Sequence, residues 1–271
     1  MATHPAHLRG QDVAHRGPLP RGTLPDLVGG GALALAASIG LAGLLGLSPA
    51  TVTLAAALHV GGALLAARGA RRAHGHHRFG PANRITTLRL AGTAVLGGVT
   101  ADAGGVAAAG AGGAWMLVAM ILVLLALDGI DGWAARRSGL ASSFGARYDL
   151  EVDAALILIL AVLAWQLGTV GAWVLAIGLL RYAFVLASLH WRWLAAPLPA
   201  SLRRKAWCVV QVSVLCALVS PWFPPPWSQG LALIALAGLV HSFALDIAWL
   251  RRRALSAAAA GRRGRAGRLP G

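Results

Sequence analysis

Residues 113–130, GAWMLVAMILVLLALDGI, form an 18-residue run in which Asp128 is the only charged side chain. A helix rises 1.5 Å per residue, so this run would be about 27 Å long, close to the roughly 30 Å hydrocarbon core of a bilayer. A stretch of this length with so few charges is typical of a transmembrane helix. The run therefore predicts that the chain crosses a membrane at least once.

Seven further apolar runs of similar character lie on either side of this stretch. Soluble domains carry about 25% charged residues, whereas this chain of 271 residues is 12% charged and 57% hydrophobic. The sequence therefore predicts an all-α, polytopic integral membrane protein with about eight transmembrane helices. In chain order, the runs cover residues 27–47, 51–67, 87–103, 113–130, 152–168, 170–189, 206–220 and 231–250.

The basic residues are distributed unevenly along the chain. Lys and Arg number 24, against nine Asp and Glu, which gives a formal net charge of +15. All of them except Arg181 fall before the first run, after the last run, or in and beside alternate connections. Basic residues accumulate on the cytosolic side of membrane proteins. We therefore expect both termini to be cytosolic, in a prokaryotic inner or plasma membrane, and the charge requires no nucleic-acid partner.

Tryptophan residues give an independent indication of the same two sides. Their amphipathic rings prefer the interface between headgroups and hydrocarbon, and all ten lie near the end of a predicted run. Trp115, Trp165, Trp173, Trp222 and Trp227 flank the connections without basic residues, and Trp133, Trp191, Trp193, Trp207 and Trp249 flank the basic ones.

The acidic residues are concentrated in one part of the chain. Five of the nine lie between residues 128 and 153, where runs four and five are joined. Asp128 and Asp131 are three residues apart, and Asp149 and Asp153 are four apart, so each pair shares one face of a helix. If the two helices are antiparallel neighbours, the four carboxylates converge on one point.

Four clustered carboxylates repel one another and require a cation to hold them. Hard oxygen ligands suit Mg²⁺ or Mn²⁺, and two pairs suit two ions. The alternative is that these residues cap helix ends or pair with Arg136, Arg137 and Arg147. Because ionisable groups at membrane depth are usually functional, we favour a metal centre formed by Asp128, Asp131, Asp149 and Asp153.

The letters around these aspartates form a longer pattern. Residues 128–153 read DGIDGWAARRSGLASSFGARYDLEVD, which fits D-x-x-D-G-x-x-A-R, eight residues, and then G-x-x-x-D-x-x-x-D. Upstream, Asn83, Thr86 and Arg89 form an N-x-x-T-x-x-R run. Together these stretches resemble the signature of the CDP-alcohol phosphatidyltransferase family, integral membrane enzymes that build phospholipid headgroups.

The resemblance implies a division of the chain into four parts. A family core of six transmembrane helices would correspond to residues 79–250. Residues 27–78 would then be an additional two-helix membrane segment with a basic loop, preceded by a flexible cytosolic N-terminus at residues 1–26 and followed by a basic cytosolic tail at residues 251–271. The resemblance also implies a homodimer.

The resemblance further implies an activity and the residues that carry it. Such enzymes displace CMP from CDP-diacylglycerol with the hydroxyl of an acceptor alcohol, using two divalent ions. The four aspartates would be the ligands, and Asp153 would also accept the proton of the alcohol. Gly145 would let the two motif helices pack closely. The residues implied to bind the CDP-linked lipid are Asn83, Thr86, Gly132, Ala135, Arg136, Ser142 and Gly145.

The acceptor alcohol is less well defined by the sequence. Relatives that use phosphorylated acceptors carry a G-K-x-K-T-x-x-Q run, of which this chain keeps Lys205 and Gln211. Arg147, Arg181 and Lys205 are candidates for binding an anionic acceptor. Basic residues beside the runs are also explained as cytosolic anchors, whereas Arg181, inside a run, needs a partner.

Two other functions remain open from the sequence alone. A member of the same family could transfer a headgroup phosphate from a CDP-alcohol to diacylglycerol. From a different class, a cation transporter could use the acidic site, although transporters place such sites near the bilayer midplane. These carboxylates lie at the cytosolic edge instead, so phosphatidyl transfer is the function we expect.

Overall fold

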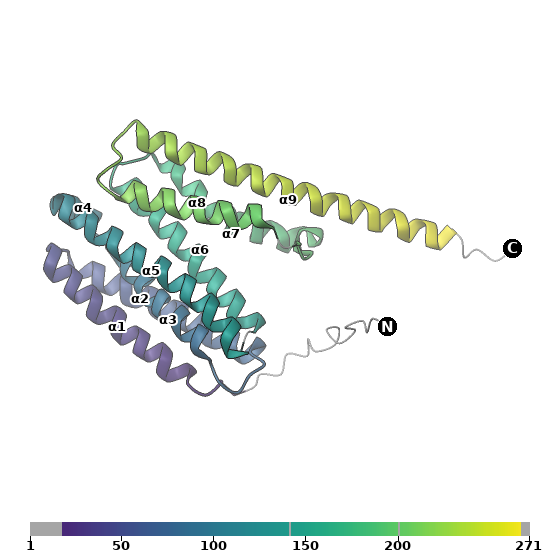
Figure 1. Ribbon diagram of the computed structural model, residues 1–271, viewed down its shortest axis with the longest axis horizontal. Helices are drawn as coiled ribbons and strands as arrows, with labels where there is room; N and C mark the ends of the chain where they lie inside the picture. The colour runs from purple at the N-terminus through teal and green to yellow at the C-terminus, as the bar shows by residue number, and fades with distance from the viewer. Residues whose placement is uncertain (1–17, 141, 200, 267–271) are drawn as a thin grey trace.

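The computed structural model describes residues 18–140, 142–199 and 201–266. These residues form helices and connections, with no strand among them (Figure 1). Two short 3-10 helices, Ala172–Val174 and Arg192–Ala195, flank α7. The α-helices are α1 (Thr23–Leu45), α2 (Pro49–Ala73), α3 (Pro81–Val99), α4 (Ala103–Ala108), α5 (Gly110–Ser138), α6 (Ser143–Gln166), α7 (Leu175–His190), α8 (Leu202–Val219) and α9 (Trp227–Ala266).

Each of the eight predicted runs overlaps one long helix, so the predicted all-α polytopic fold is confirmed. The additional short helix, α4, lies in the connection expected between runs three and four. Stretches within α1, α2, α5, α9 and the segment Ala172–His190 are long and apolar enough to cross a membrane. For the more polar α3, α6 and α8, a transmembrane course remains a prediction.

Helix α3 lies at the centre of the N-terminal bundle, where α1, α2, α5 and α6 pack around it. Its close approach to α2 depends on Gly98, where an added Cβ would lie only 2.3 Å from the carbonyl oxygen of Thr51. Because α3 is enclosed by protein, it can carry polar side chains such as Asn83, Thr87 and Arg89, all buried. The central position of α3 thus explains how this helix can carry buried polar side chains.

The connection between α1 and α2 is tied to the start of α4 by Asp102. One carboxylate oxygen accepts a hydrogen bond from the backbone N–H of Ser48 at 2.7 Å, and the other accepts one from Gly105 at 3.0 Å. These two N–H donors lower the pKa of Asp102 below its usual value. The N-terminal hairpin, formed by α1 and α2, is therefore attached to the rest of the bundle at this end as well as along α3.

Helices α8 and α9 are joined by an ion-pair cluster. The guanidinium groups of Arg203 and Arg204 contact the same oxygen of Asp246, at 2.5 and 3.1 Å. Further along the interface, the Trp207 ring lies directly against Gly238 of α9, where an added Cβ would overlap it. Trp207 therefore packs between two helices, in addition to lying near the end of a run.

Several helices extend beyond the apolar runs at their basic ends. Helix α5 continues to Ser138 and α6 begins at Ser143, so both aspartate pairs lie within helices. The predicted flexible lead over residues 1–26 is wrong at its end, because α1 begins at Thr23 and Arg21 pairs with the backbone of His77 and Phe79. The predicted tail over residues 251–271 is helical as far as residue 266, and residues 1–17 and 267–271 lie outside the described part of the chain.

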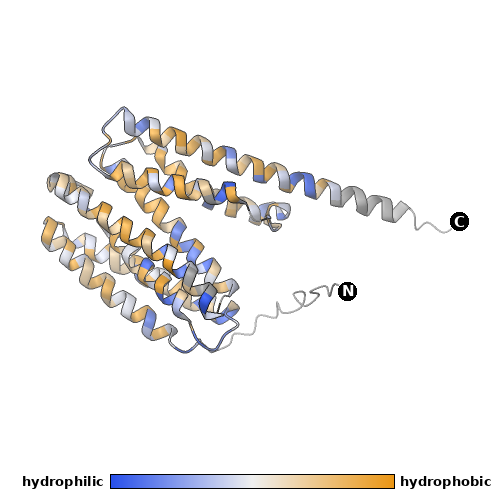
Figure 2. Ribbon diagram, in the orientation of Figure 1, coloured by the Kyte–Doolittle hydropathy of each residue, from blue (hydrophilic) through white to orange (hydrophobic). Residues whose placement is uncertain are grey.

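The start of α1 and the end of α9 lie on the same side of the molecule (Figure 1). Hydrophilic residues gather at that side, while apolar residues cover most of the helix surfaces (Figure 2). Many large apolar side chains are exposed, including Leu186 at 67%, Leu189 at 75% and Ile234 at 63%. Such surfaces are expected where helices face lipid rather than water.

Candidate active site

The side chain of Arg89 on α3 lies at the centre of the acidic cluster. It is only 1% exposed. Its Nη2 atom lies 2.9 Å from Asp128 Oδ1, and its Nη1 atom lies 2.8 Å from Asp131 Oδ2. The same guanidinium group also pairs with Asp149 and Asp153. The four aspartates predicted from their spacing therefore do converge, and they converge around a buried cation.

The two aspartate-bearing helices meet by way of α3. Both α5 and α6 pack along α3, which brings Asp131 and Asp149 to the same nitrogen of Arg89, Nη1. The expectation that Gly145 lets α5 and α6 pack closely is wrong. An added Cβ at Gly145 would lie 2.8 Å from Oδ1 of Asn83, so this glycine instead permits close approach to α3.

The acidic cluster has the donors that a divalent metal ion requires. Asp128, Asp131 and Asp149 each offer a carboxylate oxygen, and these oxygens lie within 4.8 Å of one another. At this distance each pair repels by about 3 kcal/mol at an effective dielectric constant of 20. When all are ionised, the four aspartates and Arg89 carry a net charge of −3, so one guanidinium does not neutralise them. The charge and the hard oxygen ligands fit Mg²⁺ or Mn²⁺.

Access to the carboxylates differs within the cluster. The side chain of Asp131 is 6% exposed, whereas that of Asp128 is 45% exposed. Thr86 extends from α3 toward Asp131, with its hydroxyl 3.5 Å from Oδ2. The cluster is therefore closed on the α3 side and open on the side where Asp128 and Asp149 lie.

A cavity of about 270 Å³ adjoins Asp131 and Asp149. Five of the seven residues implied to bind the CDP-linked lipid line it, and they come from α3, from α5 and from the start of α6. The other two, Ala135 and Arg136, lie on α5, and their side chains are outside the described residues. The five lining residues are Asn83, Thr86, Gly132, Ser142 and Gly145.

The rim of this cavity is ordered by hydrogen bonds that local sequence explains. Ser142 precedes α6 in an extended conformation, and its Oγ accepts the N–H of Gly145 at 3.0 Å, as an N-cap residue does. The same hydroxyl lies 3.0 Å from Nδ1 of His74, whose Nε2 lies 2.8 Å from the carbonyl oxygen of Arg78. The basic loop after α2 thus contributes His74 to the edge of the site, which the sequence did not predict.

A second cavity, of about 450 Å³, lies on the other side of the cluster between α6, α7, α8 and α9. Asp153 lines it together with Arg181, Arg204 and Gln211. Gln211 is 8% exposed, and its Oε1 has no hydrogen-bond partner within the part of the chain that the structure describes. The interior is otherwise largely apolar, with Ile177 and Phe184 among its lining residues.

The three residues considered for the acceptor alcohol do not form one group. Arg181 lines the second cavity and pairs with Glu151 at 2.5 Å, so its partner is not one of the four clustered aspartates. Arg147 lies on a different groove, beside α2. The side chain of Lys205 lies outside the described residues. Of these candidates, the structure places Arg181 beside Asp153.

Arg89 is the main residue of the site whose position was not predicted. It is part of the N-x-x-T-x-x-R run, but nothing in that run indicates that its side chain reaches the aspartates. A usable signal was present, because a charge inside an apolar span requires a partner. That rule was applied only to Arg181. Applied to Arg89, it would have pointed to the acidic residues as its partners.

Comparison with known proteins agrees with this arrangement. Searches of curated proteins and of solved structures gave no significant match. The model of the family described as CDP-alcohol phosphatidyltransferase matches residues 79–244, which is more than half of the chain. The match contains the four aspartates, Arg89 and the residues that line the 270 Å³ cavity. Because one family accounts for the whole cluster and its surroundings, the chain belongs to the CDP-alcohol phosphatidyltransferase family.

Proposed function

We propose that this membrane enzyme transfers a phosphatidyl group from CDP-diacylglycerol to a small alcohol and releases CMP. The observation that carries the proposal is the position of the acidic cluster between two cavities. Asp131 and Asp149 line the 270 Å³ cavity, and Asp153 lines the 450 Å³ cavity. A transfer reaction needs a donor and an acceptor on either side of the reacting phosphorus, and these two cavities provide such places.

In this proposal the smaller cavity receives the CMP end of the donor. Gly132 and Gly145 line its walls, while Asn83 and Ser142 offer polar atoms. Backbone without side chains allows a nucleotide to approach closely. Because the cavity adjoins Asp131 and Asp149, a diphosphate attached to CMP would lie beside the carboxylates.

Two divalent ions, Mg²⁺ or Mn²⁺, would be held by Asp128, Asp131, Asp149 and Asp153. When bound, such ions neutralise a diphosphate and stabilise the leaving phosphate. Arg89 supplies a fixed positive charge to the same carboxylates and holds them together. Because Arg89 contacts all four side chains, it would share the site with the metal ions.

Asp153 is the proposed general base, because it is the one clustered aspartate that lines the larger cavity. It would take the proton from the hydroxyl of the acceptor, whose oxygen then bonds to the phosphorus of the phosphatidyl group. The bond from that phosphorus to the oxygen of CMP breaks, and CMP leaves. The unpartnered Oε1 of Gln211 is available to accept a hydrogen bond from the acceptor.

The same cavity also favours a second candidate within the family. Its apolar lining, including Ile177, Phe184 and Phe243, suits the chains of diacylglycerol. In that case the enzyme would transfer a headgroup phosphate from a CDP-alcohol to diacylglycerol. The two reactions share the cluster and differ in which substrate carries the chains.

Two parallel assays of CMP release, one with each kind of CDP-linked donor, distinguish these reactions. The purified chain is incubated with labelled CDP-diacylglycerol, Mg²⁺ or Mn²⁺, and a panel of free and phosphorylated alcohols. We expect CMP release that depends on one acceptor. Release from a CDP-alcohol on addition of diacylglycerol would support the second candidate. No release under any condition, together with metal uptake by vesicles containing the protein, would favour a transporter.

We also propose that the site and both termini face the cytosol, and that the enzyme is a homodimer. The orientation rests on the basic residues at the helix ends around the cluster. Labelling of single cysteines introduced near Thr23 and near Arg251 in intact cells tests the orientation. Light scattering of the purified protein, corrected for detergent, tests the dimer.

A further inference from the structure

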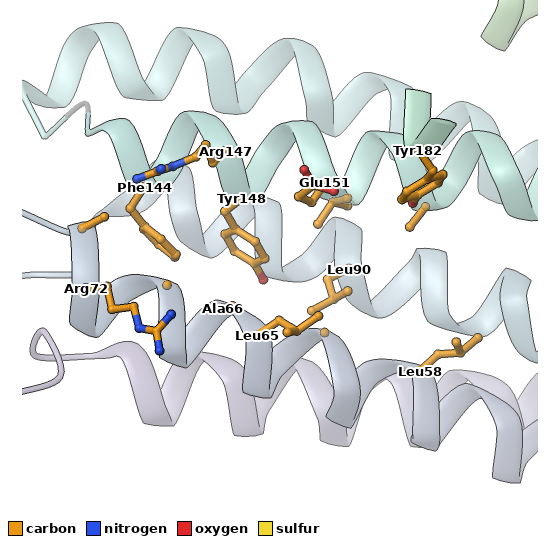
Figure 3. Close-up of a pocket in the computed structure, with 15 residues that line it drawn as sticks. Leu58, Leu65, Ala66, Arg72, Leu90, Phe144, Arg147, Tyr148, Glu151 and Tyr182 are labelled. Atoms are coloured by element: carbon orange, nitrogen blue, oxygen red, sulfur yellow. The ribbon is translucent and has the colours of Figure 1, made fainter. Parts of the chain in front are cut away.

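A third cavity, of about 520 Å³, lies between α2 and the helices α3, α6 and α7 (Figure 3). None of the four clustered aspartates lines it. Helix α2 supplies one wall and lies outside the family match at residues 79–244. The groove is therefore formed only because this chain adds a helical hairpin to the family core.

The groove has the length and surface of a site for a lipid chain. Leu58 and Arg72 lie near its two ends on α2 and are 14 residues apart, or about 21 Å along a helix. Half of a roughly 30 Å hydrocarbon core is about 15 Å, so the groove spans one leaflet. Small residues on α2 form its floor, and an added Cβ at Gly69 would lie 3.0 Å from the ring of Phe144.

Two cations stand at one end of this apolar groove. Arg72 in the last turn of α2 and Arg147 near the start of α6 both line it and are exposed. Figure 3 shows their side chains at the same end, with Phe144 beside them. Neither arginine makes an ion pair or a hydrogen bond with any residue in the described ranges. The acid of the groove, Glu151, is already paired with Arg181.

We propose that this groove binds one anionic phospholipid of the surrounding membrane. Its phosphate lies between Arg72 and Arg147, and one acyl chain follows α2 toward Leu58. Two unpaired guanidinium groups complement a negatively charged headgroup, and the apolar walls complement the chain. The bound lipid joins the N-terminal hairpin to the family core, because its site is shared between α2 and α6.

Lipid binding to the delipidated full-length protein tests this proposal directly. Native mass spectrometry gives the affinity of the first bound lipid during titration with phosphatidylglycerol or, separately, phosphatidylcholine. We expect phosphatidylglycerol to bind more tightly. The double variant Arg72→Gln, Arg147→Gln should bind it about 30-fold more weakly, from the usual effect of two basic residues near an anionic surface. Equal affinity for the two lipids would overturn the proposal.

A matched variant distinguishes lipid binding in this groove from a general effect of surface charge on lipid binding. Arg68 and Arg71 are exposed on the same helix, do not line the groove, and carry the same charge. The double variant Arg68→Gln, Arg71→Gln should therefore retain the wild-type affinity for phosphatidylglycerol. A loss equal to that of the Arg72 and Arg147 variant would overturn the proposal.

A groove-filling variant tests the position of the chain without removing charge. Ala155 lines the groove from α6, and Ala155→Phe should weaken phosphatidylglycerol binding while both arginines remain. If CDP-diacylglycerol displaced the bound phosphatidylglycerol, the groove would belong to the donor substrate and the proposal would be wrong. These measurements need no turnover, so they are independent of the proposed reaction.

Discussion

The Nη1 atom of Arg89 lies 2.8 Å from Oδ2 of Asp131, and both side chains are almost completely buried. A buried charge pair is costly to break, because the remaining partner is left without compensation. Here the remaining partners would be four carboxylates, three of them with oxygens within 4.8 Å of one another. The stability of the helices around α3 should therefore depend on which cation occupies the cluster.

Substitution Arg89→Gln should make the stability of the protein depend on divalent metal. In a chelator the variant should lose about 3–5 kcal/mol of stability, the usual cost of breaking a buried pair, and Mg²⁺ should restore much of it. Thermal unfolding in detergent, with chelator and with Mg²⁺, measures the difference. Arg84→Gln is the control, because Arg84 pairs with Asp26 on the surface, where its side chain is 62% exposed. An equal loss with and without Mg²⁺ would argue against a metal site.

Substitution Asp153→Asn should abolish turnover and leave the protein folded. Removal of a general base typically lowers the rate by 10²- to 10⁴-fold. Acceptor-dependent CMP release measures activity, and size-exclusion chromatography checks folding. Asp26→Asn, on α1 and outside the family match, should retain wild-type activity. Normal turnover by the Asp153 variant would exclude this residue as the base.

The sequence predicted the helices and the aspartate cluster for a simple physical reason. Apolar runs of membrane length report directly on helices, and spacings of three and four residues place side chains on one face. Both signals are local, so no knowledge of neighbouring helices is needed to read them. The convergence of Asp128 and Asp149 additionally required two helices to be antiparallel neighbours, which the short link between them suggested.

The features of the site that the sequence did not predict depend on which helices are neighbours. The role of α3 as the central helix, and hence of Arg89 as the partner of the aspartates, follows from packing against four other helices. Arg147 was grouped with Arg181, yet the two line different cavities because Arg147 lies on α6 beside α2, whereas Arg181 lies on α7. Residue spacing along the chain does not indicate which helices pack together or which cavity a side chain lines.

Substitution Gly98→Val should loosen the attachment of the N-terminal hairpin. The new Cβ would lie 2.3 Å from the Thr51 carbonyl oxygen and 2.8 Å from Ala55, and backbone at this position cannot move without separating α2 from α3. Overpacking usually costs about 1–3 kcal/mol, so the melting temperature should fall. Gly61→Val, on α2 with no atom within 4 Å of its Cβ position, is the control. Equal melting temperatures for the two variants would refute this account of the interface.

The contribution of Asp102 to stability should depend on pH. The N–H groups of Ser48 and Gly105 lower its pKa in the folded protein. A carboxyl group with a lowered folded pKa stabilises the protein above its unfolded pKa of about 3.9, and this stabilisation is lost as the pH falls through the folded pKa. Wild type should therefore melt at a higher temperature than Asp102→Ala at pH 7, and the gap should narrow below pH 4. A gap that stays constant across this range would show that the ionised carboxylate is not responsible.

Substitution Gly145→Ala should weaken binding of the nucleotide more than it affects the fold. The added Cβ would lie 2.8 Å from Oδ1 of Asn83, and Asn83 lines the 270 Å³ cavity. Because the asparagine side chain can turn whereas the two helices are held by many other contacts, the strain should be relieved by moving Asn83 into the cavity. We expect the KM for CDP-diacylglycerol to rise about tenfold, which corresponds to about 1.4 kcal/mol, with little change in melting temperature. Gly104→Ala, on α4 with open space at its Cβ position, is the matched control and should leave KM unchanged. An unchanged KM in the Gly145 variant would mean that this cavity does not receive the CMP end of the donor.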